Sequence, residues 1–92
     1  FVIYNNNGSV AATEQPFNLT GTYYTSATTL TNGNVLIAYT DGGNSSYGTF
    51  VVYDSTGSLV TGPTVYNSGS TSFNSAITLA NGNVSLAYSD GD

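Results

Sequence analysis

Short apolar runs recur along the chain, and turn residues separate them. No segment places apolar residues at the three- and four-residue spacing of a helix, whereas runs rich in Val, Ile, Tyr and Thr recur throughout. These runs predict four strands in one complete cycle, at residues 22–31, 34–40, 49–54 and 58–67. The pattern therefore predicts an all-β fold.

Two of the predicted strands are apolar on both faces. Residues 35–39 read Val-Leu-Ile-Ala-Tyr and residues 50–53 read Phe-Val-Val-Tyr, without the alternation of a strand that has one solvated face. Residues 25–30 carry mostly small side chains. We expect a sheet that is covered on both sides, with its small-residue strand where neighbouring units crowd together.

Glycine marks the turns between these strands. The dipeptides Asn32-Gly33 and Asn81-Gly82 predict two-residue hairpin turns of type I′, because Asn and Gly tolerate a positive φ. Gly8 and Gly57 close two further four-residue turns, and residues 41–48 form the longest predicted loop.

The chain repeats itself with a period of 49 residues. Residues 1–43 align with residues 50–92 without a gap, and 19 of the 43 aligned pairs are identical. Periods of this length indicate arrays, solenoids or propellers, in which a unit buries its apolar face only against a neighbour. We interpret residues 1–92 as a single β-repeat unit, with repeat one at 1–49 and a truncated repeat two at 50–92.

Charged side chains are nearly absent, which excludes several classes of partner. The chain has no Lys, Arg, His or Cys and only five acidic residues, so its formal net charge is −5. Nucleic acids and anionic membrane surfaces both require basic side chains, so neither is an expected partner. No apolar run reaches the roughly 20 residues of a membrane span, and we expect no membrane insertion.

The same composition argues against catalysis. Triads built on His or Cys have no members here. A carboxylate pair for glycoside hydrolysis is formally available in Asp41 and Asp90. These two residues are equivalent in the repeat, whereas catalysis requires two carboxyl groups whose environments push their pKa values apart. We therefore expect no enzyme activity.

Two kinds of ligand remain open. Hard cations prefer carboxylate and amide oxygens, so Asp41, Asp90 and Asp92 are candidate calcium ligands, and calcium is the only cofactor we consider. Neutral glycans bind to aromatic rings and amides, so the candidate ligand-binding residues are Tyr23, Tyr24, Asn44 and Tyr47. We interpret the tyrosines that repeat in the alignment as core or turn residues: Tyr4, Tyr53, Tyr39 and Tyr88.

The best-preserved segments resemble a known repeat. Residues 26–39 read Ser-Ala-Thr-Thr-Leu-Thr-Asn-Gly-Asn-Val-Leu-Ile-Ala-Tyr, and residues 48–57 read Gly-Thr-Phe-Val-Val-Tyr-Asp-Ser-Thr-Gly. This sequence resembles the blade repeats of bacterial secreted and surface β-propellers. The resemblance implies β-propeller blades, here two tandem four-stranded antiparallel repeats, and an extracellular or cell-surface location. A β-sandwich is the competing fold, although it leaves the gapless period unexplained.

The phase of the repeat suggests how such blades would be completed. If a blade starts at Thr22, the chain begins on a third strand and stops after a second strand. We expect other copies, or adjacent repeats of a longer chain, to complete the blade by strand pairing. The sequence thus favours a non-catalytic structural or adhesive repeat protein that assembles into a ring or a filament. The alternative function is a lectin-like module that binds neutral glycans.

Overall fold

The computed structural model describes residues 1–91, which fold entirely as strands and turns. Within this range no helix is long and apolar enough to cross a membrane. The prediction of an all-β fold is confirmed. The strands are β1 (Ile3–Tyr4), β2 (Val10–Ala12), β3 (Thr22–Thr29), β4 (Val35–Asp41), β5 (Tyr47–Tyr53), β6 (Leu59–Thr78) and β7 (Val84–Asp90).

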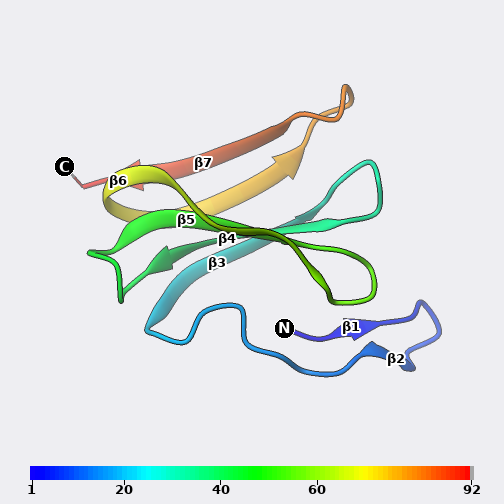
Figure 1. Ribbon diagram of the computed structural model, residues 1–92. Helices are drawn as coiled ribbons and strands as arrows, with labels where there is room; N and C mark the ends of the chain where they lie inside the picture. Colours follow the sequence, from blue (N-terminus) through cyan, green and yellow to red (C-terminus); the bar gives the residue numbers. More distant parts are fainter. Residues whose placement is uncertain (92) are drawn as a thin grey trace.

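Strands β3 to β7 form a curled antiparallel sheet in sequence order, and β1 pairs with β2 in a separate hairpin. The curl comes from β6, which pairs with β5 along its first part and with β7 along its second (Figure 1). The sequence placed the end of this strand at residue 67, which is wrong. The amide of Thr71 donates to the carbonyl of Ser46 at 3.0 Å, and this bond keeps the chain extended beyond Asn67.

The 49-residue period is reproduced in the strand pairing. All six paired positions of β3 with β4, from Thr22↔Asp41 to Thr29↔Val35, recur 49 residues later between β6 and β7. A bulge interrupts both hairpins at the same place. The β1–β2 pairs Ile3↔Ala12 and Tyr4↔Val10 likewise recur as the last pairs of β5 with β6. Residues that are equivalent in the sequence repeat therefore have equivalent partners within these hairpins.

Four turns share one geometry, and glycine occupies the same position in each. In the turn after β3, Leu30 donates to the carbonyl of Asn34 at 2.7 Å, and Gly33 donates back to the carbonyl of Leu30 at 3.0 Å. Gly33 has a φ of 88°, whereas Asn32 is not in the left-handed region. The predicted type I′ turns are therefore wrong, because that type needs positive φ at both central residues. The observed loop has three residues, and glycine is its left-handed member.

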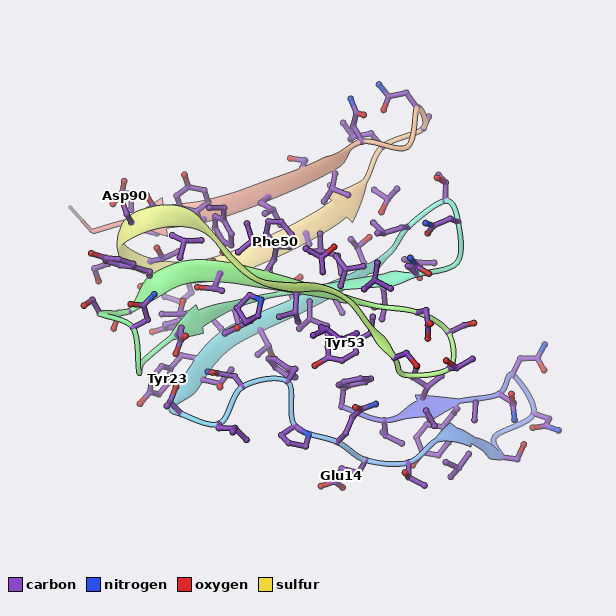
Figure 2. The ribbon with its side chains drawn as sticks, in the orientation of Figure 1. Glu14, Tyr23, Phe50, Tyr53 and Asp90 are labelled. Atoms are coloured by element: carbon purple, nitrogen blue, oxygen red, sulfur yellow. The ribbon has the colours of Figure 1, made fainter. Side chains whose placement is uncertain are left out.

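The core lies on both faces of β4 and β5. Ile37, Tyr39, Val51 and Tyr53 are buried on one face, where Phe1 and Phe17 cover them. Leu36, Ala38 and Val52 are buried on the other face, against Ala76, Val84 and Leu86 of the second repeat. Figure 2 shows Phe50 and Tyr53 on opposite sides of these strands. The expectation of a sheet covered on both sides is confirmed for these strands.

Small side chains allow the two repeats to approach closely. The amide of Ala76 donates to Ser26 Oγ at 3.0 Å, and the hydroxyls of Thr28 and Thr78 lie 3.0 Å apart. Thr78 also donates its hydroxyl to the carbonyl of Thr29. Strand β3 of one repeat therefore lies beside its own equivalent, the second part of β6.

Candidate functional site

Tyr23 and Tyr24 are neighbours near the start of β3 but have different contacts. Tyr23 is 55% exposed, and its ring covers the backbone of Gly21 and Gly42 so closely that a Cβ on Gly42 would lie 2.9 Å from it. Tyr24 has a φ of 52°, and its ring contacts Phe73 of the second repeat at a centroid distance of 4.8 Å. Tyr24 and Phe73 together form an exposed aromatic pair.

Asn44 lies in the loop between β4 and β5, and Tyr47, predicted in that loop, is the first residue of β5. The amide of Tyr47 donates to the carbonyl of Asn44 at 3.0 Å, and Asn44 donates its own amide to the carbonyl of Asp41 at 3.1 Å. Asn44 is exposed and Tyr47 is half-buried. The amide of Gly42 donates to the carbonyl of Gly21 at 2.7 Å. This bond ties the loop to the segment that carries Tyr23.

Asp41 acts as a clamp for this loop. Its Oδ1 accepts hydrogen bonds from Thr20 Oγ1 at 2.8 Å, from the Gly43 amide at 3.0 Å and from Asn18 Nδ2 at 3.2 Å. A carboxylate with three donors on one oxygen is well matched to holding two chain segments together. Sequence reasoning missed Asn18 and Thr20, whose role has no local signal because they lie about 20 residues from Asp41.

The second candidate calcium ligand, Asp90, lies on a different strand from Asp41. Asp90 occupies the equivalent place at the end of β7, opposite Thr71, and is exposed. Asp92 lies outside the described residues. Within residues 1–91, no group of three or more acidic, His or Cys side chains could hold a metal ion.

Asn74 joins three strands and was also missed by sequence reasoning. Its Nδ2 donates to the carbonyl of Tyr24 and to Thr40 Oγ1, both at 3.0 Å, and its Oδ1 accepts the hydroxyl of Tyr66. Burial, together with the nearby Tyr88 phenol, raises the pKa of Tyr66 to about 12. Thr25 stands at the equivalent position in repeat one, so a departure from the repeat was the available signal.

The tyrosines that recur in the internal repeat lie partly in the core and partly at the surface. Tyr39 and Tyr53 are buried, as predicted, whereas Tyr4 is 60% and Tyr88 is 41% exposed. The Tyr39 hydroxyl has no hydrogen-bond partner among the described residues. Burial raises its pKa, and the charge of Asp41 and the Tyr53 phenol add to this effect. Tyr39 is therefore held as a neutral phenol, which suits a core residue.

An apolar groove runs between the N-terminal segment and the β3–β4 hairpin. A cavity of about 340 Å³ is lined by the first four residues together with Ala27, Val35 and Ile37. A second cavity of about 210 Å³ continues it past Phe17. We call these two cavities the N-terminal groove. A larger hollow of about 490 Å³ lies beside Asp41, where Leu19 is 88% exposed.

Comparisons with known proteins identify no relative. The sequence matches no protein-family model, no curated protein and no solved structure.

Proposed function

We propose that this chain is a non-catalytic, extracellular β-propeller repeat protein with a structural or adhesive role, which assembles with further copies into a ring or a filament. The observation that carries the proposal is the packing of one repeat on the other through equivalent strands. Ser26 and Thr28 of β3 hydrogen-bond to Ala76 and Thr78 of the second repeat. Repeat one thus has a face that receives repeat two, and we expect repeat two to offer the equivalent face to a further copy.

The strand arrangement supports the blade interpretation. Strands β3, β4, β5 and the first part of β6 form an antiparallel four-stranded unit in sequence order. Its first strand is the one made of small residues, which suits the crowded position nearest the axis of a propeller. Its two faces are covered by different elements, the N-terminal segment with β1–β2 on one side and the second part of β6 with β7 on the other (Figure 1).

The surface supports a location outside the cell. The chain offers hydroxyls and amides in place of fixed charge, and it contains no Lys or Arg. The protein therefore presents no cleavage site for trypsin-like proteases. The absence of cysteine fits a bacterial or archaeal exterior better than a disulfide-rich animal ectodomain.

Native mass spectrometry combined with negative-stain microscopy tests this function. We expect masses that are multiples of 9.5 kDa and particles in the form of rings or filaments. A folded monomer at micromolar concentration would contradict the assembly. Circular dichroism distinguishes that outcome from a chain that fails to fold.

The exposed aromatic pair of Tyr24 and Phe73 favours a second candidate, a lectin-like module for neutral glycans. Exposed rings provide stacking surfaces for sugars, and Asn44 and Tyr47 add polar groups in the loop. A glycan array tests this candidate. Selective binding that is lost in Tyr47→Ala supports the lectin, and binding to no glycan removes it.

A further inference from the structure

The chain contains two hairpins of each of two kinds. The leading hairpins are β3–β4 and the second part of β6 with β7, which share one register. The following hairpins are β1–β2 and the pairing of β5 with the first part of β6. Both residue pairs of β1–β2 recur 49 residues later between β5 and β6. Across the boundary between the two repeats, the leading hairpin β3–β4 is joined to a following hairpin by pairing of β4 with β5 over seven residue pairs.

One hairpin of each kind is left unjoined. Among the described residues, β7 pairs only with β6, and β1 pairs only with β2. The open edge of β7 is the equivalent of the β4 edge that pairs with β5. The open edge of β1 is the equivalent of the β5 edge that pairs with β4. The two open edges are therefore complementary by the pairing rule that the chain itself uses.

We infer that β7 of one copy pairs with β1 of a second copy, and that the β6–β7 hairpin fills the N-terminal groove of that copy. This inference rests on the self-assembly proposed above and specifies its interface. The register of β4 with β5 includes Leu36↔Val52 and Ile37↔Val51. Shifted by the repeat, it places Ser85 opposite Ile3 and Leu86 opposite Val2 of the second copy.

The packing of the two repeats within one chain supplies the template for the apolar contact. In the first repeat, the face that carries Leu30 and Ala38 is covered by Ala76, Val84 and Leu86. Its equivalent in the second repeat carries Leu79 and Ala87, together with Ile77. Ile77 is 60% exposed and Leu79 is 44% exposed.

The covering residues also have equivalents, and these line the N-terminal groove. Ala76, Val84 and Leu86 correspond to Ala27, Val35 and Ile37, all of which border the cavity beside the N-terminal segment. The exposed face of the β6–β7 hairpin and the wall of the groove are therefore the two halves of an interface that the chain already makes once. The contact joins different surfaces of each copy, so it propagates head to tail.

A pair of complementary variants tests the interface. Ile77→Asp places a carboxylate on the exposed hairpin face, and Ala27→Asp places one in the groove of an otherwise unchanged chain. We expect each variant alone to lose self-association by about 100-fold or more in Kd, because a charge buried without a partner is strongly disfavoured. Leu59→Asp is the control, since Leu59 is 56% exposed on the first part of β6 and lies outside the interface.

Mixing the two variants distinguishes this interface from any other. Ile77→Asp keeps an intact groove and Ala27→Asp keeps an intact hairpin, so an equimolar mixture should form a one-to-one dimer and nothing larger. Self-association of either variant at the wild-type level overturns the interface while self-assembly stands. A wild-type chain that remains a folded monomer overturns both the interface and the proposed self-assembly.

Cysteine crosslinking tests the register without depending on a charged variant. The chain has no native cysteine, so Ile3→Cys and Ser85→Cys introduce the only thiols. Opposed residues of antiparallel strands lie within the Cα distance that a disulfide spans. We expect oxidation of mixed Ile3→Cys and Ser85→Cys chains to give the crosslinked heterodimer. The mixture of Ser9→Cys with Ser85→Cys should give none, and equal crosslinking in both mixtures contradicts the proposed register.

Discussion

Asn74 donates a hydrogen bond to the backbone carbonyl of Tyr24 at 3.0 Å and so joins the second repeat to the first. The carbonyl belongs to a bulge residue in the left-handed region, which the hairpin pairing skips. A side chain therefore supplies the donor that the strand ladder does not provide. The same amide reaches Thr40, whose hydroxyl donates to the carbonyl of Thr71 at 2.7 Å.

Replacing Asn74 by alanine should destabilise the fold by about 2–3 kcal/mol. The substitution leaves the Tyr24 carbonyl and the Tyr66 hydroxyl without their partner in a partly buried position, and unsatisfied polar groups cost about 1–3 kcal/mol. Urea unfolding measures the change. Asn44→Ala in the exposed loop is the control, and we expect it to stay within about 0.5 kcal/mol of wild type. Equal stabilities of the two variants would contradict this role for Asn74.

The approximate starts of strands β3 to β6 could be predicted from the sequence because apolar runs and glycine turns carry local signals. The predicted strand at 34–40 differs by one residue at each end from the observed Val35–Asp41. The continuity of β6 could not be predicted, since it depends on a change of partner from β5 to β7 within one strand. The turn type was also out of reach, because Asn-Gly is compatible with both two- and three-residue loops.

The Gly33 turn offers a test of backbone strain. Gly33→Ala should destabilise the protein by about 1–2 kcal/mol, because alanine is disfavoured at a φ of 88° although no atom lies within 4 Å of the added Cβ. Gly62→Ala is the matched control, since its Cβ also meets open space and its φ is not positive. We expect that control to be neutral or stabilising by about 0.4–1 kcal/mol. Thermal unfolding of both variants measures the difference.

The Asp54 turn should make the stability of the fold depend on pH in the acidic range. The hydroxyl of Thr56 at 2.6 Å, and then the amide of Ser58 at 3.0 Å, lower the pKa of Asp54 below 3.8. A carboxyl group whose pKa is lowered by folding stabilises the protein above its unfolded pKa, and this contribution is lost as pH falls through the folded value. Asp54→Asn should flatten stability against pH below about 4.

Glu14→Gln provides the control for this titration, because Glu14 is exposed; Figure 2 shows it on the segment that follows β2. Asn5 stands at the position equivalent to Asp54 and makes the same turn, so asparagine is compatible with this backbone. If the free energy of unfolding fell equally with decreasing pH in wild type and in Asp54→Asn, the prediction would be contradicted.

Asp41 allows the loop clamp and calcium binding to be told apart. We expect Asp41→Ala to lower stability by about 1–3 kcal/mol, because Thr20, Asn18 and the Gly43 amide lose a shared acceptor. We also expect the wild-type melting temperature to be the same with calcium and with a chelator. A chelator that lowers the melting temperature of wild type, but leaves that of Asp41→Ala unchanged, would instead make Asp41 a calcium ligand.

Two contacts at the candidate site could not be predicted from the internal repeat. Sequence reasoning chose Tyr23 and Tyr24 as aromatic rings for a glycan, yet Tyr24 contacts its own equivalent in the repeat, Phe73. Contacts between equivalent residues depend on how closely the repeats stack, which the period does not specify. Asp41 was recognised as a loop residue, but the side chains that donate hydrogen bonds to it were not. One of these donors is Thr20, and the residue aligned with it in repeat two has no hydroxyl group.

Tyr66 should make the protein unfold in alkali. Its pKa is raised from 10.0 to about 12 by burial and by the Tyr88 phenol, whose ring lies 5.3 Å away. A phenol whose pKa is raised by folding contributes stability that is fully present below pH 10 and is lost as pH rises through about 12. Absorbance titration of the native protein should therefore show a tyrosine that ionises near pH 12, and Tyr66→Phe should remove this ionisation.

Tyr4→Phe is the control for loss of a 60% exposed phenol. Because Tyr66→Phe also removes the hydrogen bond to Asn74, it should cost about 1 kcal/mol at neutral pH while making the alkaline limb shallower. If Tyr66→Phe were less stable at pH 7 but lost stability with rising pH as steeply as wild type, another tyrosine would control unfolding in alkali.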